Sequence, residues 1–227
     1  MSGTREHSGG FTIIELVIAL AIIGIVAAMA LPSWQQFQVD QRLREVTRAS
    51  ANMMQTARSQ AIATGNNHIV YLALGAGTDI CGNPLQDAQG RAVPMLILED
   101  SAAGSPCCIG GTERVITEPV FTRPGVMNSV NWGMTFAVVQ SPSDTGGGDP
   151  TTGSTFTDRN GNQTRWVMFR PDGIPVGVSN GCVAGEIGSG AGGIYVTNAN
   201  RDYAVVLTPL GGAHVAGFER SSGGWTN

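Results

Sequence analysis

The longest apolar run in the sequence lies near its N-terminus, from Phe11 to Leu31. Glu15 is the one ionisable side chain within these 21 residues. As an α-helix, with a rise of about 1.5 Å per residue, the run would be roughly 30 Å long, the thickness of the hydrocarbon core of a bilayer. The pattern predicts a helix that can span a membrane.

Beyond Pro32 the pattern becomes amphipathic. From Ser33 to about Thr64, apolar side chains recur every three or four residues, which predicts a helix with one buried face. The positions of this face are Phe37, Leu43, Val46, Ala49 or Ser50, Met53, Ala57 and Ala61. Pro32 removes a backbone donor, so we expect a kink there. The pair Gly65-Asn66 predicts the C-terminal end of the helix.

The rest of the chain predicts a β domain. Its 32 glycines and 11 prolines, against 13% charged residues, favour short strands joined by many turns. The candidate strands are His68–Leu74, Met95–Leu98, Arg114–Phe121, Met134–Val139, Arg165–Phe169 and Tyr203–Thr208. Asn160-Gly161 is a preferred two-residue turn and predicts a hairpin that returns through Arg165–Phe169. The expected fold class is α+β, with a long N-terminal helix packed on a C-terminal antiparallel sheet or sandwich.

The chemistry of the side chains argues against an enzyme. Every basic residue counted is an arginine, which excludes a Walker-type phosphate loop, a Schiff-base lysine and a Ser-Lys dyad. There is no His-x-x-x-His pair, and the carboxylates are scattered. His7, His68 and His214 offer little for a metal, and Asp158-x-Asn160-Gly161-Asn162 lacks the register of a calcium loop. We expect no cofactor and no metal, and the net charge of −4 provides no surplus for a polyanion.

Four cysteines lie beyond the apolar run: Cys81, Cys107, Cys108 and Cys182. None forms a C-x-x-C pair, which argues against zinc and for disulfides in an oxidising compartment such as the periplasm. The adjacent Cys107 and Cys108 are expected to bond elsewhere, because a bridge between neighbours is strained. We expect one bond from Cys81 to this pair and one from Cys182, although free buried thiols are the alternative.

Glu15 needs a compensating charge if the apolar run enters a bilayer. A carboxylate within a membrane helix is costly and usually has a partner. Cleavage between Gly10 and Phe11 would create an α-amino group at the start of the helix. That cation could compensate the Glu15 carboxylate of a neighbouring subunit whose helix is shifted along the bundle.

The N-terminal residues resemble those of a known family. Gly10-Phe11-Thr12-x-x-Glu15, followed by an apolar helix with Pro32, is similar to the N-terminus of type IV pilins and pseudopilins, and the chain most resembles the GspH/FimT-type minor pseudopilins. The resemblance implies that a prepilin peptidase cleaves after Gly10 and methylates the new N-terminal Phe11. It also implies that the helix serves as membrane anchor and as filament core, with Phe11 and Glu15 acting in assembly.

The expected organisation follows from this resemblance. Residues 1–10 would be the leader peptide, 11–31 the transmembrane and filament-core helix, 32–65 its amphipathic extension, 66–216 the globular β domain and 217–227 a flexible tail. The implied partners are other pilins or pseudopilins, the prepilin peptidase, the inner-membrane assembly platform and, before assembly, membrane lipid. The implied function is that of a minor subunit of a type II secretion pseudopilus or type IV pilus.

Other interpretations remain open. The run could be a secretory signal peptide cleaved at Ala28-Met29-Ala30, or a plain single-pass anchor. A DNA-binding minor pilin of a competence pilus is the alternative function, but relatives of the FimT kind carry a Gly-Arg-x-Arg turn where this chain has Leu210-Gly211-Gly212-Ala213-His214. DNA is therefore not expected as a partner. An anchored periplasmic enzyme would need a deep polar pocket with facing carboxylates.

The arginines near the apolar run give a conflicting signal about orientation. Arg42, Arg44 and Arg48 follow the run and only Arg5 precedes it, so the positive-inside rule favours a cytoplasmic C-terminal part. The cysteines and the resemblance favour the opposite orientation. We expect a single-pass inner-membrane protein with its C-terminal domain in the periplasm, which then enters the filament.

Overall fold

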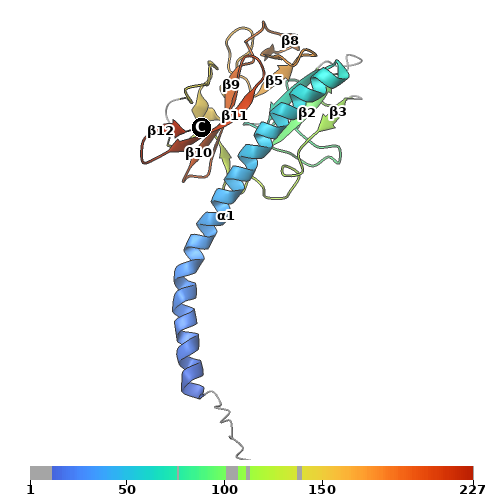
Figure 1. The fold of residues 1–227 in the computed structure, drawn as a ribbon. Helices are drawn as coiled ribbons and strands as arrows, with labels where there is room; N and C mark the ends of the chain where they lie inside the picture. Colours follow the sequence, from blue (N-terminus) through green and yellow to red (C-terminus); the bar gives the residue numbers. More distant parts are fainter. Residues whose placement is uncertain (1–11, 76, 101–106, 111–112, 137–139, 227) are drawn as a thin grey trace, which may run out of the picture. The chain divides into compact units, whose positions relative to one another are not determined.

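The computed structural model describes residues 12–75, 77–100, 107–110, 113–136 and 140–226, apart from the side chains of Ala30 and Pro32. The chain divides into two compact units, Met1–Gln38 and Val39–Asn227. Helix α1, Ile13–Thr64, begins in the first unit and ends in the second (Figure 1). The prediction of a long N-terminal helix is confirmed.

The first unit consists of the first part of α1 and has no buried side chain among its described residues. The large apolar side chains from Ile13 to Leu31 are 54–84% exposed. The helix continues through position 32, and the kink expected at Pro32 stays a prediction. Phe37 is 54% exposed, so its assignment to the buried face of the extension is wrong. The buried face begins only at Leu43.

In the second unit, α1 carries a continuous buried stripe. Its members recur at helical spacing and are Leu43, Val46, Ala49, Ser50, Met53, Ala57 and Ala61. The neighbouring Thr47 and Ser50 hydroxyls donate to the carbonyls of Leu43 and Val46, so these buried polar groups are satisfied within the helix. The amphipathic pattern thus identified the stripe correctly.

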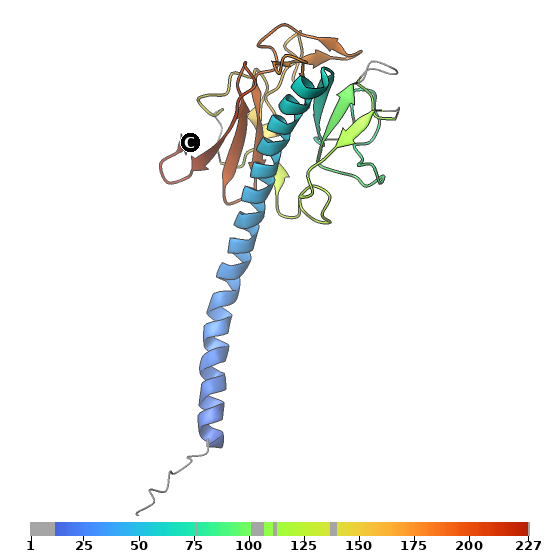
Figure 2. The ribbon, with the colours of Figure 1, turned by 45° about the vertical axis from the view of Figure 1, so that its right-hand side comes forward.

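The second unit contains two five-stranded sheets and one small hairpin. The first sheet has the order β3-β2-β1-β5-β6 and the second the order β12-β11-β10-β9-β4, with β7 and β8 paired separately (Figure 2). All the strand pairs are antiparallel. The first sheet comprises β1 (Asn67–Leu72), β2 (Met95–Asp100), β3 (Arg114–Ile116), β5 (Trp166–Phe169) and β6 (Pro175–Val176). The second comprises β4 (Asn131–Trp132), β9 (Gly192–Thr197), β10 (Asp202–Leu207), β11 (Ala213–Glu219) and β12 (Gly224–Thr226). The hairpin strands are β7 (Val178–Ser179) and β8 (Val183–Ala184), and a 3-10 turn covers Pro150–Thr152.

Alternation along the strands builds a core on each face of the first sheet. Val70 and Leu72 of β1 join the main core with the buried stripe of α1, whereas Ile69 and Tyr71 join a second core with Leu85. Because side chains alternate across a strand, β1 is buried on both faces. The main core also includes residues of β9 and β10, so α1 covers one face of both sheets.

Two of the predicted strands differ from the structure. Strand β3 ends at Ile116, well before the predicted end at Phe121. The described part of the predicted strand 134–139, residues 134–136, is not a strand. There the amides of Thr135 and Phe136 donate to the carboxylate of Asp202, at 2.7–3.1 Å. A side chain therefore takes the donors that a neighbouring strand would use.

Within the expected tail at 217–227, the described residues include paired strands. Strand β11 extends to Glu219, and β12 pairs with it through Gly217↔Thr226 and Glu219↔Gly224. The ring of Trp225 packs edge-on against Tyr195 and Phe218, with centroids 5.8 and 5.5 Å apart. These aromatic contacts give the last strand a packing partner. Strand β9 was also missed, because its Gly192-Gly193 start resembles a loop.

Three tight turns share one construction. They span Asp79–Asn83, Asp87–Arg91 and Asp158–Asn162, and in each the first residue donates its amide to the carbonyl of the fifth. The aspartate side chain accepts the amide of the fifth residue, and a glycine with positive φ stands fourth. The predicted turn at Asn160-Gly161 is therefore real, but it is a three-residue loop closed by Gly161 rather than a two-residue turn.

Two disulfides close the second core. Cys81 bonds Cys108, and Cys107 bonds Cys182, with Cα–Cα distances of 5.7 and 5.8 Å. The expected pattern, with the adjacent pair bonding outward, agrees with these bonds. They join the loop after β1, the segment after β2 and the β7–β8 hairpin. These three segments lie outside the two large sheets and are therefore held together by covalent cross-links.

Candidate functional site

The start of α1 is held by a capping interaction. Thr12 Oγ1 accepts the amide of Glu15 at 3.3 Å, and the Thr12 carbonyl accepts the amide of Leu16 at 3.2 Å. A threonine followed three residues later by glutamate is the sequence signature of a capping box, a signal that predicts this helix start. The hydrophobic pattern alone missed it. The cap places Glu15 in the first helical turn.

Glu15 is exposed at this end of the helix. In the part of the chain that the structure describes, no ion pair involves its carboxylate. The partial positive charge of a helix N-terminus favours a carboxylate in the first turn. It does not replace a full counter-charge in a medium of low dielectric constant. The carboxylate is therefore available to a cation from another molecule.

Gly10 and Phe11 lie outside the described residues. The cleavage between them and the methylation of the α-amino group of Phe11 therefore stay predictions.

The apolar part of α1 has the length and composition of a membrane span. An 18-residue window of α1 has a mean hydropathy of 2.8 and none of it is buried. Soluble core helices with such composition are mostly buried, whereas this segment exposes its side chains. Its exposed surface fits membrane anchoring.

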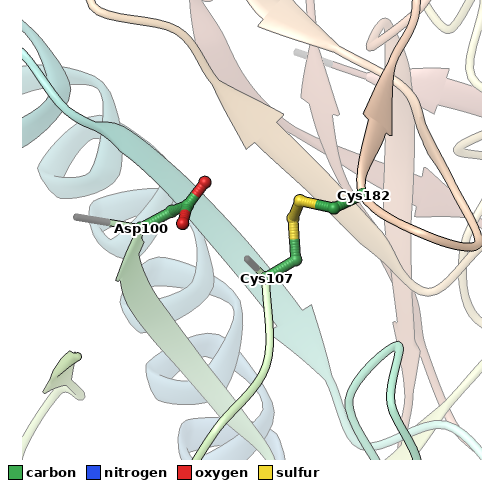
Figure 3. A group of neighbouring side chains, drawn as sticks. All are labelled: Asp100, Cys107 and Cys182. Carbon is green, nitrogen blue, oxygen red and sulfur yellow. A yellow bond between two sulfur atoms is a disulfide. The ribbon is translucent and has the colours of Figure 1, made fainter. Parts of the chain in front are cut away.

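The cysteines form a group that resembles a metal site by proximity alone. Ligand atoms of Asp100, Cys107 and Cys182 lie within 4.8 Å of one another (Figure 3). Both sulfur atoms belong to the disulfide, and a metal would require free thiolates. The group is therefore a cross-link with a neighbouring carboxylate.

Two buried tyrosines have perturbed acidity. Burial, reinforced by the hydrogen bond to Asp144, raises the pKa of Tyr195, and burial with the nearby charge of Asp79 raises the pKa of Tyr71. Tyr195 donates to Asp144 Oδ2 at 2.5 Å, and Tyr71 donates to the Cys107 carbonyl at 2.5 Å. Both hydroxyls stay protonated and act as donors that tie loops to the sheets.

A hollow beside the last three strands gives no support to an enzyme. It has a volume of about 670 Å³ and lies on β10, β11 and β12. Its charged lining residues are Arg201, Glu219 and Arg220. With one carboxylate among the described residues that line it, it lacks the facing pair that acid–base hydrolysis needs.

The turn between β10 and β11 occupies the place of the DNA-binding turn considered above. The Thr208 amide donates to the Gly212 carbonyl at 2.8 Å and the Gly211 amide to the Thr208 carbonyl at 2.9 Å. The turn has no arginine of its own. Arg58 of α1 donates to the Gly211 carbonyl at 3.3 Å and so braces the turn.

Comparison with known proteins points to one class. Residues 6–31 match the prokaryotic N-terminal methylation motif. A fimbrial protein of Pseudomonas aeruginosa is 47% identical over 57 residues, which are 25% of this chain and 36% of the relative. Fimbrial protein EcpC of Eikenella corrodens is 53% identical over 41 residues, which are 18% of this chain and 27% of the relative. No solved structure matches the chain.

These matches show that the chain carries the prokaryotic N-terminal methylation motif and is similar to part of the fimbrial proteins. The resemblance of Gly10-Phe11-Thr12-x-x-Glu15 to prepilins is confirmed, since the matching motif includes these residues. The chain spans about a third of the length of the curated relatives it matches.

Proposed function

We propose that this chain is a minor subunit of a type IV pilus or of a type II secretion pseudopilus, of the GspH/FimT type. It is made as a precursor, cleaved between Gly10 and Phe11 by a prepilin peptidase, and methylated at Phe11. Before assembly, it is anchored in the inner membrane with its second unit in the periplasm. An assembly platform then moves it into a filament.

The observation that carries this proposal is the placement of Glu15. A capped helix start holds the carboxylate in the first turn of an exposed apolar helix. Transferring such a group into an apolar filament core is costly unless a cation meets it. The α-amino group released at Phe11 of a neighbouring subunit supplies that cation. The N-terminal methylation motif and the similarity to fimbrial proteins support the same contact.

The two disulfides support the periplasmic orientation. They cross-link the second unit, and disulfides persist in oxidising compartments. The arginines that follow the apolar run favour the reverse orientation under the positive-inside rule. The resemblance to the pilin family, in which the β domain is exported, favours the periplasmic orientation, and the proposal adopts it.

Replacing Glu15 tests the proposal directly. Glu15→Val should leave membrane insertion and leader cleavage intact but remove the chain from sheared filaments, because the amine of the neighbour then has no carboxylate to meet. Glu15→Asp keeps the charge and should retain part of the incorporation. Glu186→Val, the same change in the second unit, should have no effect. Normal incorporation of Glu15→Val would remove the mechanism.

A further inference from the structure

A run of arginines lines one side of the second unit. Three adjoining hollows, of about 360, 140 and 350 Å³, lie along α1 and the 118–128 segment. The first two share Glu45, and the last two share Arg123, so they form one continuous depression. The arginines that line it are Arg42, Arg44, Arg48, Arg91 and Arg123. This surface is called the arginine groove below.

Three of these arginines have partners within the chain. Arg42 donates to the Asn128 carbonyl at 2.9 Å. Arg91 pairs with Asp87 at 2.7 Å, and Arg123 pairs with Glu45. These contacts fix the walls of the arginine groove and use the carboxylates of Asp87 and Glu45.

Arg44 and Arg48 are different. Among the residues that the structure describes, neither has a hydrogen-bond or ion-pair partner. They stand four residues apart on α1, a spacing at which like charges repel each other and destabilise a helix. Among the described residues no ion pair offsets this repulsion, so the two arginines are suited to a negative group from outside.

The composition of the arginine groove narrows the choice of partner. Its five arginines face three carboxylates, Glu45, Glu118 and the Asp87 bonded to Arg91, so it is positive on a chain of net charge −4. Val120, which is partly exposed, adds apolar surface. A phosphate backbone would gain nothing from Val120, whereas an acidic protein segment can pair its carboxylates with the arginines and cover this valine with an apolar side chain.

We propose that the arginine groove receives an acidic segment of a neighbouring filament subunit, whose carboxylates pair with Arg44 and Arg48. This inference rests on the proposed filament function. It adds a second, lateral contact, on the second unit, to the contact between Glu15 and the α-amino group. The positive side chains would set which subunit docks here, since charge complementarity mainly governs specificity.

The test compares charge variants of the full-length chain in cells that assemble filaments. Arg44→Glu with Arg48→Glu should reduce the chain in sheared filaments by about tenfold or more, because two attractive contacts become repulsive. Arg44→Gln with Arg48→Gln, which is gentler on folding, should reduce it less. Arg159→Glu, at an exposed turn position, is the matched control and should behave as wild type. Protease resistance of the membrane-bound precursor shows that each variant folds.

A photo-crosslinking residue at Asn52, which lines the same hollow as Arg44 and Arg48, identifies the partner. We expect a cross-link to an acidic peptide of a pilin-family subunit, lost in the double Arg→Glu variant. Wild-type incorporation of that variant would overturn the inference and leave the filament function standing. A gel shift of DNA by the full chain in detergent, dependent on Arg44 and Arg48, would assign the arginine groove to a polyanion instead. Absence of the wild-type chain from filaments would remove the proposed function and this partner together.

Discussion

The two units of this protein differ in where their side chains find partners. In residues 12–38 no described side chain is buried, and Glu15 has no counter-charge among the described residues. In residues 39–226 the stripe of α1, two sheets and two disulfides make a closed core. The first unit thus exposes an apolar surface that lipid or other helices can cover. The second unit is stabilised by its own contacts. The matching N-terminal methylation motif lies in the first unit, and the two sheets lie in the second.

Removing a disulfide should have the largest effect on the free energy of unfolding of the second unit. In the loop-entropy model, the Cys107–Cys182 bond, which closes 75 residues, contributes about 4.5 kcal/mol, and the Cys81–Cys108 bond, which closes 27 residues, about 3.6 kcal/mol. Replacing each pair by alanine should lower the free energy of unfolding of the second unit in that order. Urea unfolding of the full chain in detergent, followed by tryptophan fluorescence, measures both. Equal losses would show that loop length does not govern the effect.

Two leucine-sized positions on the same helix sharpen the comparison. Leu43 is fully buried, and Ile22 is 56% exposed. Leu43→Ala should cost about 2–5 kcal/mol, because it removes apolar contacts and leaves a cavity. Ile22→Ala should leave unfolding of the second unit unchanged. A large loss from Ile22→Ala would mean that the first unit contributes to the core.

A substitution in one of the tight turns should lower the free energy of unfolding by a smaller amount than Leu43→Ala does. Gly161 has a φ of 82°, and a methyl group added to its Cα would meet open space, so Gly161→Ala tests backbone strain alone. The left-handed conformation should cost alanine about 1–2 kcal/mol. Gly161→Asn should cost less, since asparagine tolerates this conformation. Denaturant midpoints of the two variants measure the difference, and equal midpoints would contradict it.

Acidic pH should weaken the aspartate turns by the smallest amount. Burial works to raise the pKa of Asp158, but hydrogen bonds from Asn162 and Asn160 outweigh it and hold the pKa below its ordinary value. A lowered folded-state pKa stabilises the fold above the ordinary value of about 3.9, and this contribution is lost as the pH falls through the folded value. Asp158→Asn should therefore lose less stability than wild type between pH 7 and pH 3. An unchanged pH slope would remove the role of the charge.

Much of the fold could be predicted because its signals are periodic. The stripe from Leu43 to Ala61 follows from helical spacing, and the apolar run and the strands around Val70 and Ile97 follow from their apolar composition. Strand β9 and the β11–β12 pair were not predicted, because glycines interrupt their apolar pattern. Tertiary contacts, such as that of Trp225 with Tyr195, stabilise them. Propensity is a weak guide where packing decides.

The functional residues divide in the same way. Glu15 is evident from the sequence because a carboxylate in an apolar run demands an explanation, and the cysteines because of their spacing. The free state of Arg44 and Arg48 among the described residues could not be predicted, since it depends on Glu45 pairing with Arg123 from a distant segment. Which charges a fold leaves unpaired is a property of its tertiary contacts.

The N-terminus of the chain in its filament tests the central claim most directly. Intact-mass and terminal-peptide mass spectrometry of sheared filaments should find a polypeptide that begins at Phe11 and carries one methyl group on its amine. A filament-borne chain that keeps residues 1–10 would contradict the account, because the cation that meets Glu15 would then never form.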